Sequence, residues 1–118
     1  MISDNNLEEE MNDVPTITWL GQSGKHYRYW ICPLGSYLGY EPGNYIFAKE
    51  TTPGHWVPCY IGQTENLSTG VGDREAFARR NGATHIHAHL KPGGEAVRRA
   101  EVTDLNVNWK PHSNEQLV

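Results

Sequence analysis

Residues 43–67, GNYIFAKETTPGHWVPCYIGQTENL, contain two runs of strand-forming residues on either side of a Pro-Gly turn. The runs cover 43–48 and 56–62 and are rich in aromatic and β-branched side chains. The turn signal between them, residues 51–55, predicts that the two strands pair in antiparallel fashion. Pro58 has no backbone N–H, so we expect it near the start of its strand or at a sheet edge.

Similar patterns on both sides of this segment complete the expected fold. Residues 17–20 and 27–32 predict two strands joined by a turn at 21–24, so that 14–42 form an N-terminal β-hairpin extension. After residue 62 we expect a helix that is firm over 73–80 and stops at Asn81-Gly82, a strand over 84–90 and a helix over 95–109. This order predicts one α+β domain, with a small, mostly antiparallel sheet flanked by helices.

Charge is distributed unevenly along the 118 residues, whose net charge is −4. Residues 1–13 hold five acids and no base, and we expect an acidic disordered tail there. The segment 74–110 holds seven bases against four acids, which predicts a basic strip that is able to track phosphates. No apolar run is long enough to span a bilayer and no signal peptide is recognisable, so we expect a cytoplasmic protein with no membrane partner.

Three groups of residues have side chains suited to chemistry. Tyr45 and Tyr60 lie near the centres of two paired strands, where two phenols on one face are able to bind phosphate oxygens or to relay a proton. Each also fits an ordinary half-buried strand position. A second group is on the last helix, where Glu101 and Asp104 are neighbours at i, i+3. They fit either a hard cation or a surface ion pair with Arg98 and Arg99.

Histidines alternate with small or apolar residues in the strand expected over 84–90. His85, His87 and His89 follow one another at i, i+2 and i+4, so one strand points all three to the same side. A zinc site is one interpretation of this pattern. Consecutive same-face residues are about 7 Å apart on a straight strand, however, which favours the wet face of a sheet or contact with a phosphate backbone.

The order of these motifs resembles the GIY-YIG nuclease family, which includes intron homing endonucleases and the incision subunit of excision repair. The resemblance covers Gly43-Asn44-Tyr45-Ile46, then residues 60–67, a helix, Asp104-Leu105, and Pro111 with Asn114. It implies a GIY-YIG-like domain over 43–118. Residues 14–42 would then be a hairpin added to the three-stranded sheet of that family.

The resemblance also implies a function, the hydrolysis of DNA phosphodiester bonds assisted by Mg²⁺ or Mn²⁺. Tyr45, Tyr60, Gly62 and Asn114 match the family pattern directly. The family arginine falls on Gly70, and Arg74, one helical turn later, is the expected substitute. The family metal-binding glutamate falls on Val102, and the adjacent Glu101 is the expected metal ligand. Further contacts to DNA are expected from the bases and histidines of the second half: Arg79, Arg80, His85, His87 and Lys91.

An alternative function follows from the two positions at which the chain differs from the family pattern. Gly70 and Val102 stand where the family has charged catalytic groups, and their loss removes charge stabilisation from the transition state. The chain is then a catalytically inactive module that keeps the fold and binds nucleic acid or a protein partner, alone or as a homodimer. The acidic tail would in that case mimic DNA or cover the basic strip.

Overall fold

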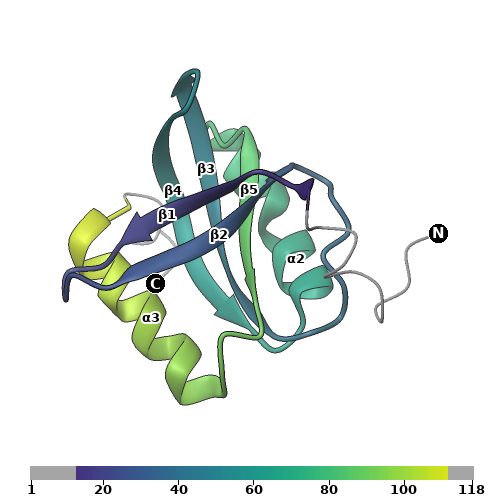
Figure 1. Ribbon diagram of the computed structural model, residues 1–118. Helices are drawn as coiled ribbons and strands as arrows, with labels where there is room; N and C mark the ends of the chain where they lie inside the picture. Colours follow the sequence, from purple (N-terminus) through teal and green to yellow (C-terminus); the bar gives the residue numbers. More distant parts are fainter. Residues whose placement is uncertain (1–12, 112–118) are drawn as a thin grey trace.

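Five strands form one antiparallel sheet in the computed structural model, which describes residues 13–111 (Figure 1). Their order across the sheet is β1-β2-β5-β3-β4. Two helices accompany the sheet in the described part of the chain, and together they make the α+β fold that the sequence predicts. The bounds of the elements are β1 Thr16–Leu20, β2 His26–Pro33, β3 Gly43–Thr52, β4 His55–Thr64, α2 Leu67–Arg80, β5 His85–Leu90 and α3 Glu95–Trp109.

The β3–β4 hairpin has the antiparallel pairing predicted from residues 43–62. Tyr45 lies opposite Gly62 and Phe47 opposite Tyr60. Past this point the register shifts, and Ala48 pairs with Pro58. Since β4 is an edge strand, the missing N–H of Pro58 costs no ladder bond to a further strand, as its sequence position indicates.

The N-terminal hairpin extends the same sheet. β1 pairs with β2, and β2 continues the sheet by pairing with β5. Its turn is fastened to α3 by Asp104, whose carboxylate accepts hydrogen bonds from the backbone N and the Oγ of Ser23 at 2.8 and 2.7 Å. A Cβ on Gly21 would lie 2.0 Å from Oδ2 of Asp104, so this close approach requires glycine.

The two helices cover opposite faces of the sheet. Tyr45 and Phe47 of β3 point into a core cluster that includes Leu67 and Val71 of α2, and we call this side the α2 face. Their neighbours Ile46 and Ala48 point into a second cluster with Leu105 of α3, on the α3 face. Alternation along the strands therefore assigns each candidate side chain to one face.

Two expectations concern the ends of the chain and the membrane. The acidic tail over 1–13 lies outside the described residues except for Asp13. Neither α2 nor α3, the helices of the described range, is long and apolar enough to cross a bilayer.

Candidate functional site

Tyr45 and Tyr60 stack on the α2 face. Their ring centroids are 5.8 Å apart and the ring planes differ by 27°. Gly62 lies directly beneath them, because a Cβ there would be 2.7 Å from Cε1 of Tyr60 and 3.0 Å from Cζ of Tyr45. Gly62 therefore serves the site by leaving room for the two phenols.

Arg74 reaches the same place from α2. The helix runs without a break from Leu67 to Arg80 and starts at Asn66, whose side chain accepts a hydrogen bond from the backbone N of Thr69. Arg74 places its Cζ 5.2 Å from the centroid of the Tyr60 ring, within cation–π range. The unbroken helix thus brings Arg74 to the two tyrosines, one turn after Gly70.

A cavity of about 260 Å³ opens beside these side chains. We call it the phosphate cleft, together with the stacked tyrosines and Arg74. Its lining is polar and comes from β3, the end of β4 and one side of α2: Tyr45, Gln63, Thr64, Gly70, Asp73 and Arg74. Because Tyr45 is 2% exposed, the guanidinium of Arg74 is the group at this cavity that can donate hydrogen bonds to the oxygens of an anion.

Tyr45 is held in its neutral form. Burial raises its pKa above the usual value for tyrosine, and the neighbouring Tyr60 adds to this effect. Arg74 opposes the rise through its charge and a hydrogen bond but does not outweigh it. At neutral pH the Tyr45 side chain is therefore a protonated, buried phenol rather than a phenolate base.

Gly70 has no space for the arginine that the resemblance would place there. A Cβ on Gly70 would lie 2.4 Å from Oγ1 of Thr64. That hydroxyl is held by Asn66, to whose carbonyl it donates and from whose backbone N it accepts. The cation of this site therefore comes from Arg74.

Glu101 lies on the α3 face, away from the phosphate cleft. It is 5% exposed, and its Oε2 accepts hydrogen bonds from Oη of Tyr29 at 2.6 Å and from Nδ1 of His89 at 2.8 Å. Burial alone would raise the pKa of Glu101, but the hydrogen bonds from His89 and Tyr29 outweigh it and lower the pKa. The structure thus does not bring Glu101 together with Tyr45, Tyr60 and Arg74.

The surface ion pairs considered for Glu101 and Asp104 are wrong. Asp104 caps the N-terminal hairpin and accepts a further hydrogen bond from Oη of Tyr27 at 2.7 Å. Those hydrogen bonds, from Ser23 and then from Tyr27, lower the pKa of Asp104. Arg98 and Arg99 pair instead with Glu65 and Glu95, at 2.8 and 3.2 Å.

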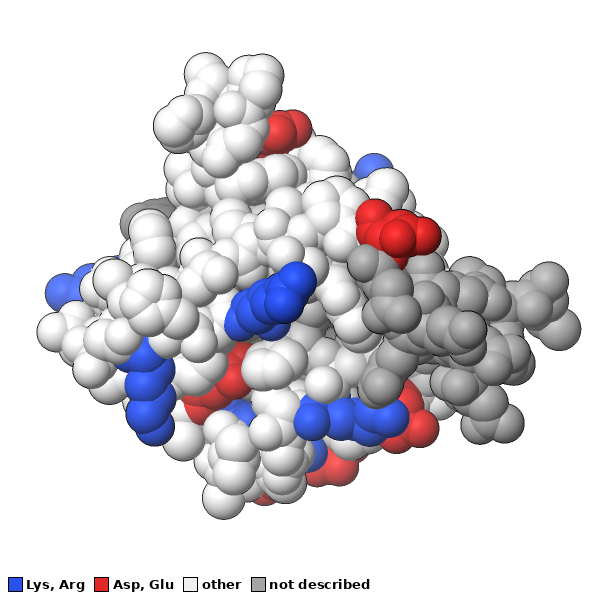
Figure 2. Space-filling model, in the orientation of Figure 1, with Lys and Arg blue, Asp and Glu red and all other residues white. Residues whose placement is uncertain are grey.

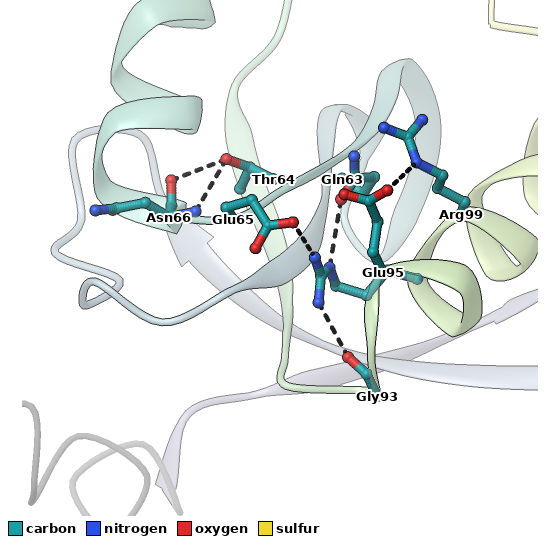
Figure 3. Close-up of polar contacts among 8 residues, drawn as sticks. Gln63, Thr64, Glu65, Asn66, Gly93, Glu95 and Arg99 are labelled. Atoms are coloured by element: carbon teal, nitrogen blue, oxygen red, sulfur yellow. Dashed lines mark hydrogen bonds and ion pairs between the residues drawn. The ribbon is translucent and has the colours of Figure 1, made fainter.

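Arg98 has a structural role that its sequence position did not predict. Its side chain is 4% exposed and donates to Gln63, to Glu65 and to the backbone oxygen of Gly93. Figure 3 labels these three partners. These bonds join the start of α3 to the segment between β4 and α2. The same segment sets the start of α2, on which Arg74 is carried. A lone arginine within a run of charged residues gives no sequence signal for such burial.

The three histidines share one side of β5, as their spacing predicts, but the expected wet face is covered. His87 is fully buried and accepts a hydrogen bond from Nε1 of Trp19 at 3.0 Å, with the Trp56 ring 4.6 Å away. Burial lowers its pKa to about 3. His85 packs against Trp56, and His89 binds Glu101. His87 therefore has no access to a DNA backbone, which corrects its prediction as a substrate-binding residue.

No metal cluster is present within residues 13–111. This range contains no group of three or more His, Cys, Asp or Glu side chains placed to hold a metal ion. Cys32 and Cys59 are buried free thiols.

The remaining predicted contacts are scattered over the surface. Arg79 pairs with Glu75 at 3.3 Å, while Arg80 and Lys91 are exposed. Figure 2 shows that, on the face in view, Lys and Arg side chains are separated by uncharged and acidic ones. The basic strip therefore does not form a continuous patch on that face. Asn114 lies outside the described residues.

Comparisons with known proteins identify no relative of the chain. Family models, curated proteins and solved structures were each searched, and none of them matches the chain.

Proposed function

We propose that this chain is a GIY-YIG-like domain that binds DNA and holds one of its phosphates in the phosphate cleft. The observation that carries the proposal is the position of Arg74, over the Tyr60 ring and at the rim of the cavity that Tyr45 also lines. A guanidinium offers several fixed N–H donors to phosphate oxygens.

The order of the elements supports the GIY-YIG-like part of this proposal. A β3–β4 hairpin carries both tyrosines, α2 carries the arginine, and β5 and α3 follow. β5, β3 and β4 are neighbours in the sheet, and they correspond to the three-stranded sheet of the family. β1 and β2 add the N-terminal hairpin outside that unit.

The metal that the resemblance implies does not fit Glu101. Its carboxylate is buried, belongs to the opposite face of the sheet and already accepts two hydrogen bonds. Freeing it would leave the buried hydroxyl of Tyr29 without its acceptor, at a cost of about 1–3 kcal/mol. This favours binding of DNA without hydrolysis.

Hydrolysis is the second candidate, and Asp73 is the observation that favours it. Asp73 brings a carboxylate to the phosphate cleft. Mg²⁺ in phosphoryl-transfer sites is commonly held by one or two carboxylates together with the substrate phosphate, and it stabilises the negative charge that develops there.

Binding is tested with fluorescein-labelled single-stranded and duplex DNA by fluorescence anisotropy. Arg74→Gln should weaken binding at least about tenfold, because a charged hydrogen bond to phosphate contributes about 1.5–3 kcal/mol. Arg99→Gln is the matched control, since it removes an equally charged, exposed side chain from α3. Equal affinities of the two variants would reject the phosphate cleft.

Hydrolysis is tested separately by nicking of supercoiled plasmid in Mg²⁺ or Mn²⁺. An inert wild type supports the binding module. Nicking that is lost in both Tyr60→Phe and Asp73→Asn would establish the nuclease instead.

A further inference from the structure

A second cavity lies on the α2 face, over the N-terminal hairpin. Its volume is about 340 Å³, and its lining comes from β1, β2 and β5: Thr16, Arg28, Trp30, Ala88, His89 and Leu90. On this face α2 packs mainly on β3 and β4, toward the opposite edge of the sheet, and it does not cover β1 and β2. We call this cavity the hairpin groove.

The strand register connects the hairpin groove to the phosphate cleft. Trp30 lies opposite Ala88, and Ala88 lies opposite Tyr45 on its other side. Paired residues point to the same face, so these three side chains form one row across β2, β5 and β3. Two strand spacings separate Trp30 from Tyr45 in this row, about 10 Å. Ala88 lies between them in the row and is 1% exposed, so other side chains of the core cluster cover it.

The groove combines an aromatic ring with a cation. Trp30 is half-buried and packs against the core cluster of the α2 face, which fixes its ring. Arg28 is exposed, and its Nε donates to Oγ1 of Thr16 at 3.3 Å, which anchors the guanidinium beside the groove. An aromatic face stacks with a nucleobase, and an adjacent arginine neutralises a phosphate of the same strand.

We propose that the hairpin groove binds an unstacked base of DNA on Trp30, with Arg28 on a neighbouring phosphate. The inference rests on the proposed function and specifies its substrate as single-stranded DNA. Stacked nucleotides of one strand rise by about 3.4 Å each, so about three of them span the distance between Trp30 and Tyr45. A duplex presents no free base face to Trp30, because its bases are stacked within the helix.

Anisotropy titrations with two labelled pentanucleotides test this inference on the full-length protein. One is pentathymidylate, and the other has the same sugars and phosphates without bases. Wild type should bind the intact pentamer about tenfold more tightly, since one base stacked on an aromatic ring gives an effect of this order. Trp30→Leu should bind both pentamers equally, and Trp30→Phe should keep most of the preference.

Two further variants separate stacking from charge and from general effects. Arg28→Gln should weaken both pentamers to the same degree and reduce the salt dependence by about one counterion. Trp109→Leu is the matched control, because Trp109 is 39% exposed and packs against Trp19 of the α3 cluster. Its affinities should equal those of wild type.

The outcomes distinguish the base site from the phosphate cleft. Equal binding of both pentamers by wild type, or an undiminished preference in Trp30→Leu, would overturn the base site whatever Arg74→Gln does. A preference that requires Trp30 while Arg74→Gln binds normally would support the base site and reject the phosphate cleft. If Trp30→Leu does not fold, as judged by its thermal melt, the indole N–H signal of Trp30 in wild type decides: the intact pentamer should shift it, and an unchanged signal would overturn the base site. Failure of wild type to bind either pentamer would reject both proposals.

Discussion

The two faces of the sheet use polar side chains in opposite ways. On the α3 face, Glu101 is buried and accepts hydrogen bonds from Tyr29 and His89, whereas buried His87 has a partner at Nδ1 and none at Nε2. On the α2 face, Arg74 and Asp73 line a cavity that opens to solvent. A buried, satisfied polar group specifies packing, whereas a charged group at an open cavity is available to a ligand. Glu101 and His87, two residues that the sequence marked for chemistry, therefore belong to the packing of the α3 face.

Acidification should lower the free energy of unfolding through the α3 face, and this is the largest effect that we expect. The pKa of His87 is about 3 in the fold against 6.5 in the unfolded chain, so below pH 6.5 protons bind preferentially to the unfolded state. Stability is complete above pH 6.5 and falls by about 1.4 kcal/mol per pH unit, which gives about 3 kcal/mol by pH 4. Urea denaturation at pH 7, 6, 5 and 4 measures this slope.

His87→Phe is the control for that slope. It keeps an aromatic ring against Trp56 and removes the titrating group, so stability should become nearly independent of pH between 6.5 and 5. A slope that persists in this variant would assign it to another residue. The depressed pKa of Glu101 adds its own loss only at lower pH, as the pH falls below about 4.5.

Removal of the buried carboxylate should have the next largest effect. Glu101→Gln replaces an anion that accepts from Tyr29 and His89, and we expect a loss of about 2 kcal/mol in the free energy of unfolding at pH 7. Glu95→Gln is the matched control, since Glu95 is exposed and its ion pair with Arg99 lies in solvent, where such pairs add little to stability. Similar losses in the two variants would contradict the structural role of Glu101.

Two glycines of α2 provide a finer test of the α2 face. Gly72→Ala should stabilise the protein by about 0.5–1 kcal/mol, because its Cβ meets nothing within 4 Å and alanine favours a helix. Gly70→Ala should destabilise it by about 1 kcal/mol despite the same propensity, because its Cβ would meet Thr64. Thermal melts measure both. Stabilisation by both substitutions would show that the Thr64 side chain moves aside at little cost. The fold would then have space for an arginine at position 70.

Local patterns were sufficient to predict the elements and one part of the site. Period-two alternation and turn residues located the strands, and helical spacing placed Arg74 one turn from Gly70. The same alternation put the three histidines on one side of β5. It did not show that Trp19, 68 positions away, would cover that side and bury His87. Nor did the helical pattern of α3 reveal that Glu101 meets Tyr29 and His89. Which face is covered depends on contacts distant in sequence, and a single sequence does not encode these as a local pattern.

Mapping of amide chemical shifts during a titration with single-stranded DNA compares the two faces of the sheet in one measurement. We expect the largest shifts on the α2 face, around Gly62, Gly70 and Arg74, with small shifts around Glu101 and Val102. Shifts concentrated on α3, with the amides of the phosphate cleft unchanged, would contradict this expectation.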